Sequence, residues 1–276
     1  MTLATLAEVL QPALKGNYAV AGLVTLGWED MRAYVAAAEA ENVPVILQAG
    51  PSCRDHTPLP VLGQMFRYLA EQASVPVVAH LDHGYTAEDC MLAIDSGFTS
   101  VMYDGSRSSL AQNINDTAAI VEMAHAAGVS CEGEIGFVGY SGGEGSAGTD
   151  PDEAAKFARD TGVDAMAISV GNIHLQQEKD GGLDEDRIRA IESVTSVPLV
   201  IHGGSGVPVA QRRMLAQTSN VCKFNIGTEL RMAFGAAMRD AVNRDMSRFD
   251  RVAILRETHD PLVVATRRVL KTFKAK

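Results

Sequence analysis

The sequence predicts an α/β protein built as a single (β/α)8 barrel, the TIM-barrel fold. Eight short apolar segments alternate with longer segments of helical periodicity, at about 25 to 35 residues per unit. The length of 276 residues fits one barrel, with one domain over residues 1–276, better than two ordinary domains. Reactive side chains also follow the apolar segments, which is where barrel enzymes carry their active sites. The alternation alone also fits an open, doubly wound sheet.

Helices are expected where apolar residues recur every three or four positions between a capping residue and a glycine stop. The clearest start is Asp150 followed by Pro151, because aspartate caps a helix and proline suits its first position. The expected helices cover residues 3–14, 28–41, 58–73, 86–96, 109–127, 150–161, 184–193, 209–217, 229–244 and 261–271.

Strands of a parallel barrel are buried on both faces, so they are expected as short, nearly continuous apolar runs. The expected strands cover residues 18–24, 43–48, 75–81, 98–103, 129–135, 164–170, 197–201 and 221–224. Residues 136–149 contain six glycines and few apolar side chains, so a mobile loop is expected there.

The charge and the cysteines limit the kind of protein. Aspartate and glutamate number 34 against 24 lysines and arginines, a formal charge of -10, which argues against a nucleic-acid or anionic-membrane surface. The 4 cysteines show no Cys-x-x-Cys spacing, and no leader peptide or run of about 20 apolar residues is found. A cytoplasmic protein with reduced thiols and a small-molecule substrate is expected.

The reactive residues fall at one end of the predicted barrel. Each lies at or just past the C-terminal end of a predicted strand, and in a barrel these ends form one face. Their types are those of a metal site with acid and base groups beside it. They are Asp82, His83, Asp104, Glu132, Glu134, His174, His202 and Asn225.

Three histidines are the candidate metal ligands. Most single histidines only pack or cap, but His83, His174 and His202 follow three different strands. Three neutral imidazoles with one open position suit catalytic zinc. Asp104 and Glu134 either hold a second metal or only cap the barrel end.

Two carboxylates are candidates for proton transfer. Asp82 either moves a proton at a substrate hydroxyl or only orients a neighbouring histidine. Glu144 is the only carboxylate of the glycine-rich loop, so it either acts as a base when the loop closes or remains a solvated charge.

Glycine-rich turns after the last two strands predict a phosphate site. Such turns often bind nothing, so their place at the barrel mouth carries this prediction. The residues are Gly203, Gly204 and Ser205 in one turn and Asn225, Ile226, Gly227 and Thr228 in the other.

Six segments, in this order, resemble the class II ketose-bisphosphate aldolases, the metal-dependent fructose- and tagatose-bisphosphate aldolases. The resemblance covers about residues 76–230. The segments are His80-Leu-Asp-His-Gly, Ser100-Val-Met-Tyr-Asp-Gly-Ser, Glu132-Gly-Glu-Ile-Gly, Gly142-Gly-Glu, His202-Gly-Gly-Ser-Gly and Asn225-Ile-Gly-Thr-Glu.

The resemblance implies an enzyme that cleaves a ketose phosphate or bisphosphate to dihydroxyacetone phosphate and an aldehyde, as a homodimer or homotetramer. Asp82 would exchange the proton at the cleaved carbon, and Glu144 would be the loop acid. Asp104 and Glu134 match positions that hold a second divalent or a monovalent cation, and the two glycine-rich turns match the dihydroxyacetone-phosphate site. The implied zinc ligands are His83, His174 and His202.

Two segments depart from that family. Its second zinc histidine is usually followed by glycine and an aromatic residue, but Leu175 and Gln176 follow His174 here. The usual Phe-Asn-Val of the first strand is replaced by Ala-Gly-Leu-Val-Thr-Leu at residues 21–26, and no basic residues match those that hold a second phosphate. An unphosphorylated or acidic aldehyde half is therefore a hypothesis.

Three other functions fit the same residues. A zinc-dependent isomerase or epimerase would use the same metal and proton chemistry without breaking a carbon-carbon bond. A Schiff-base aldolase would use Lys223, the only lysine on a predicted strand. A non-catalytic phosphosugar-binding protein would keep the phosphate site and lack turnover.

Overall fold

The protein is a closed barrel of eight parallel strands, as the sequence predicts. The computed structural model describes residues 2–143, 145–178 and 182–274. Each barrel strand pairs with the next, and the first pairs with the last, so the open-sheet alternative is wrong. The strands are β2 (Val20–Val24), β3 (Val45–Ala49), β4 (Val77–Gly84), β5 (Ser100–Tyr103), β6 (Ser130–Ile135), β7 (Ala165–Ile168), β8 (Leu199–Ile201) and β9 (Val221–Ile226).

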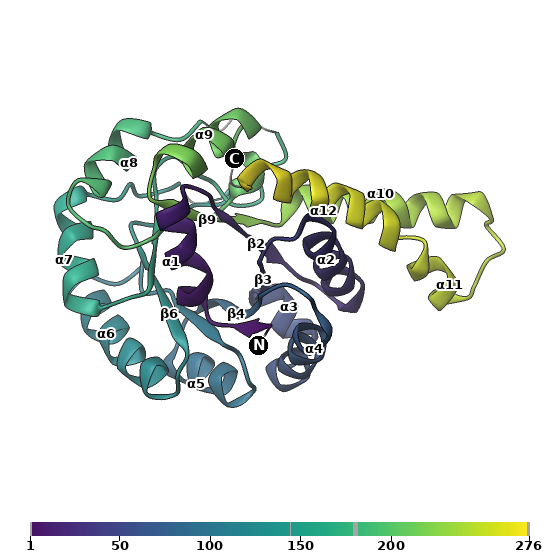
Figure 1. Ribbon diagram of the computed structural model, residues 1–276, viewed down its shortest axis with the longest axis horizontal. Helices are drawn as coiled ribbons and strands as arrows, with labels where there is room; N and C mark the ends of the chain where they lie inside the picture. The colour runs from purple at the N-terminus through teal and green to yellow at the C-terminus, as the bar shows by residue number, and fades with distance from the viewer. Residues whose placement is uncertain (1, 144, 179–181, 275–276) are drawn as a thin grey trace.

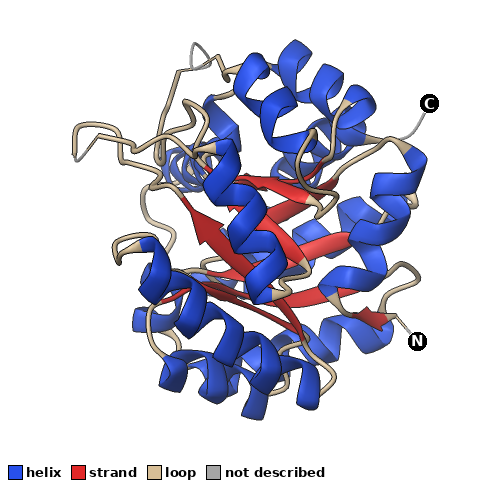
Figure 2. Ribbon diagram, turned by 90° about the vertical axis from the view of Figure 1, so that its left-hand side faces the viewer, coloured by secondary structure: helices blue, strands red, loops and turns tan. Residues whose placement is uncertain are grey.

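Helices surround this barrel on its outside (Figures 1 and 2). All the predicted helices are present with ends shifted by a few residues, and no helix in the described ranges is long and apolar enough to cross a membrane. The helices are α1 (Leu6–Gly16), α2 (Trp28–Glu41), α3 (Pro51–His56), α4 (Leu59–Gln72), α5 (Ala87–Asp95), α6 (Leu110–Ala126), α7 (Pro151–Thr161), α8 (Glu185–Glu192), α9 (Val209–Thr218), α10 (Thr228–Arg244), α11 (Arg251–Arg256) and α12 (His259–Phe273).

Three short elements are absent from the sequence prediction. Strand β1 (Leu3–Ala4) has two residues and pairs with β4. Helices α3 and α11 have six residues each, which is too short for a helical repeat of apolar side chains to show. Helix α11 lies at the end of an arm that α10 and α12 carry away from the barrel (Figure 1).

Helix α1 closes the N-terminal end of the barrel. Thr5 caps it, because the Thr5 side chain accepts the backbone N–H of Glu8 and the Glu8 side chain accepts that of Thr5. The helix packs on inward side chains through Leu6, Val9, Leu10 and Ala13, against Val20, Ile46, Val78 and Val200. This end of the barrel interior is therefore apolar, and the inward polar residues stand nearer the other end.

Backbone hydrogen bonds connect the two ends of the glycine-rich loop and join the loop to a neighbouring segment. The sequence analysis expects a mobile loop and does not predict these bonds. Phe137 and Ala147 exchange two backbone hydrogen bonds of 2.8 Å. The N–H of His174 donates to the carbonyl of Gly139 at 2.8 Å, and the N–H of Ser141 donates to the carbonyl of His174 at 3.0 Å. The described part of this loop is therefore fixed to the segment that carries His174.

Candidate active site

Three histidines meet at the C-terminal mouth of the barrel. His83 stands near the end of β4, His174 lies between β7 and α8, and His202 follows β8. The ring centroid of His83 lies 4.8 Å from that of His202 and 5.2 Å from that of His174. One nitrogen of each ring lies within 4.8 Å of the other two. This cluster, the three-histidine cluster, matches the prediction that these residues converge.

The three-histidine cluster has a donor set that fits a metal ion. The Nδ1 atom of His202 is buried and has no hydrogen-bond partner in the described ranges. Burial, together with the neighbouring His202 and His83, lowers the pKa of His174 to about 3. Neutral imidazoles with a free lone pair are the form in which histidine binds metals.

Asp104 and Glu134 lie beside His83 and form a second group with it. Asp104 Oδ2 accepts a hydrogen bond from His83 Nδ1 at 2.8 Å, and ligand atoms of the three side chains lie within 4.8 Å of one another. Burial and the nearby Asp104 raise the pKa of Glu134 to about 8. Burial opposes protonation of His83, but Asp82 and Asp104 outweigh it and raise the pKa of His83 to about 9. A cation placed here would displace these protons.

The turn that carries His83 is strained, and hydrogen bonds from a side chain of helix α3 hold it in place. His83 has a φ of 54°, a left-handed value that few residues other than glycine adopt. The guanidinium of Arg54 donates to the backbone carbonyls of Asp82 at 2.9 Å and of His83 at 2.7 Å. Helix α3, which the sequence does not predict, therefore supplies the group that fixes this turn.

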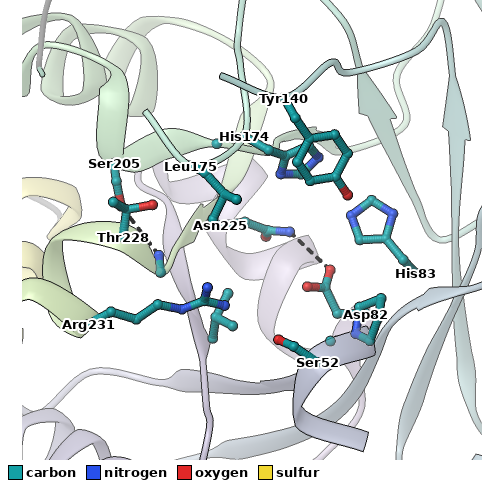
Figure 3. A pocket seen from close by; sticks show the side chains of 15 residues that line it. Ser52, Asp82, His83, Tyr140, His174, Leu175, Ser205, Asn225, Thr228 and Arg231 are labelled. Carbon is teal, nitrogen blue, oxygen red and sulfur yellow. Dashed lines mark hydrogen bonds between the residues drawn. The ribbon is translucent and has the colours of Figure 1, made fainter. Parts of the chain in front are cut away.

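Asp82 points into the space between the three-histidine cluster and Asn225 (Figure 3). The Nδ2 of Asn225 donates to Asp82 Oδ1 at 3.4 Å. Burial would raise the pKa of Asp82, but His83 and His202 together with Lys223 lower it on balance. Asp82 is therefore an ionised carboxylate at neutral pH, the form that accepts a proton.

A cavity of about 360 Å³ opens above these side chains. Asp82, His83 and His174 line one side of it, while His202 is buried beneath. Ser205 and Thr228 lie across the cavity from His83 (Figure 3). The lining includes most of the predicted phosphate-binding residues, namely Gly203, Ser205, Asn225, Gly227 and Thr228.

The two glycine-rich turns are joined into one surface. Gly203 has a φ of 64°, and a Cβ there would lie 2.2 Å from the carbonyl oxygen of Ile173, so only glycine fits. The Oγ of Ser205 accepts the backbone N–H groups of Gly227 and Glu229, each at 3.3 Å. This places the turn after β8 against the N-terminus of α10, where the helix dipole favours an anion.

Two predicted phosphate-binding residues lie behind the cavity surface, and the predicted loop acid cannot be placed. Gly204 and Ile226 are buried behind it, where a Cβ on Gly204 would lie 3.1 Å from Ile226 Cδ1. Glu144 lies outside the described residues.

The structure adds cavity residues that the sequence analysis does not single out. The ring of Tyr140 stacks on His174, with centroids 4.8 Å apart and planes 25° apart. Ser52, at the start of α3, and Arg231, in the first turn of α10, point into the cavity (Figure 3). The Nε of Arg231 is buried and has no hydrogen-bond partner in the described part of the chain. Its spacing of three residues from Thr228 is a helical signal that could have indicated it.

The two departures from the aldolase pattern have local structural reasons. Leu175 keeps a φ of 59°, a conformation natural to the usual glycine, so the turn survives with strain. A Cβ on Gly22 would lie 1.9 Å from Gln48 Oε1, so glycine in β2 makes room for that side chain inside the barrel. Gln48 is fully buried, and neither atom of its amide has a partner in the described residues.

Lys223 does not fit the Schiff-base alternative. Its side chain is fully buried in the barrel, and its Nζ lies 2.6 Å from Glu132 Oε2. Lys223 is also absent from the cavity lining. A carbonyl bound in the cavity therefore does not meet this amine.

The fold and the site together define a barrel enzyme with a candidate metal centre and a candidate anion site at its mouth. The sequence profile described as fructose-bisphosphate aldolase class-II matches residues 4–276. The chain therefore belongs to the class II fructose-bisphosphate aldolase family and is an aldolase, an enzyme of the lyase class.

Two relatives and one solved structure are similar to this chain over nearly its whole length. The fructose-bisphosphate aldolase of Geobacillus stearothermophilus is 37% identical over 257 residues, covering 91% of this chain and 89% of that protein. The 6-phospho-5-dehydro-2-deoxy-D-gluconate aldolase of Shouchella clausii is 34% identical over 278 residues, covering 98% and 94%. The crystal structure of the YdjI aldolase from Escherichia coli K12 superposes with a TM-score of 0.86 at 30% identity, covering 99% and 98%.

Proposed function

We propose that the protein is a zinc-dependent aldolase that cleaves a ketose phosphate or bisphosphate to dihydroxyacetone phosphate and an aldehyde, and condenses them in reverse. The observation that carries the proposal is a single cavity with the three-histidine cluster and Asp82 on one side and the glycine-rich turns on the other. A ketose whose phosphate sits at the turns would have its carbonyl near the histidines and a hydroxyl near Asp82.

Zinc suits the donor set better than magnesium or calcium, because those hard cations prefer oxygen ligands. His83, His174 and His202 would hold it, and Asp104 with Glu134 would hold a second divalent or a monovalent cation. Bound zinc would polarise the ketone and stabilise negative charge on the adjoining carbon. The orphaned Nδ1 of His202 supports this assignment.

Asp82 is proposed as the proton acceptor of the cleavage step. It takes the proton of the C4 hydroxyl as the C3–C4 bond breaks and returns it in condensation. The carbon left behind at C3 then needs a proton, and Glu144 is proposed to donate it, on the resemblance of its loop.

The glycine-rich turns are proposed to bind the phosphate of dihydroxyacetone phosphate. The backbone N–H groups of Gly203, Gly204 and Ser205 and the start of α10 at Thr228 supply donors without a positive side chain. Asn225, Ile226 and Gly227 complete the turn on the other side. This explains how a protein of net charge -10 can bind a phosphate.

Arg231 is proposed to bind an acidic group on the aldehyde half. It is a cation in the cavity lining, and its buried Nε lacks a partner among the described residues. The relatives named above act on a bisphosphate and on a phosphorylated gluconate, and each of these substrates carries two acidic groups. A distal phosphate or carboxylate would meet Arg231 and Ser52.

Two alternatives share this site. An isomerase or epimerase would use the same residues and return a sugar with all its carbons, and a non-catalytic phosphosugar-binding protein would bind and release it unchanged.

We also propose that the protein works in the cytoplasm as a homodimer or homotetramer, as its reduced, buried cysteines and its resemblance suggest.

The experiment is an NADH-coupled assay for dihydroxyacetone phosphate over ketose mono- and bisphosphates, with the products identified by NMR. Release of dihydroxyacetone phosphate supports the aldolase. A rearranged sugar supports the isomerase, and binding without any product supports the binding protein.

The distal site is tested by comparing fructose 1,6-bisphosphate with fructose 1-phosphate in the Arg231→Met variant. Loss of a charge-assisted contact should lower kcat/KM for the bisphosphate by about 10- to 100-fold and leave the monophosphate nearly unchanged. Arg239→Met, an exposed site further along α10, is the matched control. An equal loss with both sugars would contradict the assignment.

A further inference from the structure

A chain of buried polar side chains crosses the barrel interior beneath the three-histidine cluster. The distances are 2.8 Å from Ser100 Oγ to His80 Nδ1, 3.3 Å from His80 Nε2 to Lys223 Nζ, 2.6 Å from Lys223 Nζ to Glu132 Oε2, and 3.1 Å from Glu132 Oε1 to His202 Nε2. Every member has zero exposure. None of them lines the cavity, and only His202 has a role in the proposed reaction.

The direction of every hydrogen bond in this chain follows from Lys223. A lysine ammonium has three donors and no acceptor. Lys223 therefore donates to His80 Nε2, so the proton of His80 is on Nδ1 and is donated to Ser100. Burial and the charge of Lys223 lower the pKa of His80 to about 3, which agrees with a neutral ring.

The other arm of the chain reaches the metal ligand. Glu132 Oε2 accepts from Lys223, and Glu132 Oε1 accepts the Nε2–H of His202. With its proton on Nε2, His202 has its lone pair on Nδ1. That atom is buried, lies 3.5 Å from Glu134 Oε2 and has no hydrogen-bond partner among the described residues.

Stability does not account for this ion pair. Taking two charges out of water costs about as much as their attraction returns, and an apolar pair of the same volume is often as stable. The hydrogen bond between Glu132 and His202 connects the Lys223–Glu132 ion pair to the three-histidine cluster, which gives the ion pair a role that an isolated one would not have.

We propose that Lys223 is a positioning residue for the metal centre: it holds the side chain of Glu132 in place, and Glu132 fixes the tautomer and orientation of His202. This inference rests on the proposed role of the three-histidine cluster as a metal site. Lys223 thus serves the reaction from inside the barrel and touches neither substrate nor metal.

The test uses the double variant Lys223→Met/Glu132→Gln, because a single change would leave a buried charge unpaired. The glutamine has the shape of glutamate but is neutral and no longer held by Lys223, so it no longer fixes His202, and the variant has no net change in charge. Zinc affinity, measured by competition with a chelating dye, should fall about 10- to 100-fold. The exposed pair Lys156 and Asp160 provides the control, since Lys156→Met/Asp160→Asn should bind zinc like the parent.

A second measurement needs no variant. The 15N shifts of His202 in the metal-free parent should show one tautomer, with the proton on Nε2. A proton on Nδ1, or a mixture of tautomers, would overturn the inference, and so would a double variant with the parent's zinc affinity. A parent that binds no zinc would instead overturn the proposed function.

Discussion

Replacing Asp82 by asparagine should stop carbon-carbon cleavage while the metal and phosphate sites persist. The side chain has little free space, since a Cβ on Gly50 would lie 3.3 Å from Asp82 Oδ2, so only an isosteric change is suitable. Asparagine cannot take the proton of the C4 hydroxyl. Loss of a general base lowers rates by about 100- to 10,000-fold. At 1.36 kcal/mol per tenfold, this is a barrier higher by about 2.7 to 5.4 kcal/mol.

Two assays separate this role from a structural one. Cleavage is followed by the coupled assay, and the exchange of the C3 hydrogen of dihydroxyacetone phosphate in D₂O is followed by NMR. Asp82→Asn should lose cleavage, keep exchange within about tenfold and bind zinc like the parent. Cleavage within tenfold of the parent would refute the assignment of Asp82 as the base, and an equal loss of exchange would show that Asp82 also serves C3.

Three further predictions follow from the site and the fold. Glu144→Gln should lose exchange about 100-fold or more because C3 loses its donor, and release of dihydroxyacetone phosphate should fall with it; unchanged exchange would exclude Glu144. Without metal the pKa values of His83 and Glu134 are raised to about 9 and about 8, so both hold protons at pH 7 that a cation must displace. Zinc at the three-histidine cluster displaces the His83 proton, so zinc affinity in competition titrations should rise from pH 6 to 8 by up to about tenfold per pH unit, and affinity that does not change with pH would contradict this. In Gly63→Ala the new Cβ would lie 2.0 Å from the carbonyl oxygen of Ser96, so urea unfolding should show a loss of about 1 to 3 kcal/mol, and an unchanged midpoint would contradict the packing.

The barrel was predictable from the sequence because its strands are buried on both faces. Runs such as β7 and β8 are apolar whatever their neighbours are, and the helices between the strands have caps and periodicity of their own. β1, α3 and α11 owe their form to tertiary pairing or to a single turn. Their sequences contain too few residues for any period to appear.

The site was predictable where residues sit at strand ends, because parallel strands bring those ends together. His83, His174 and His202 meet for this reason. The contacts of Arg54 and Lys223 were not predictable, since each joins segments whose distance in space no spacing in the sequence gives. Arg54 reaches the turn of β4 from α3, and Lys223 reaches Glu132 across the barrel.

The dependence of aldol cleavage on zinc at the three-histidine cluster tests the central claim most directly. The metal content of the purified protein would be measured, and release of dihydroxyacetone phosphate would be followed before chelation with EDTA, after it, and after zinc is restored. The account predicts bound zinc, loss of release with EDTA and recovery with zinc. Release that persists in the metal-free protein, or a protein that takes up no metal, would contradict it.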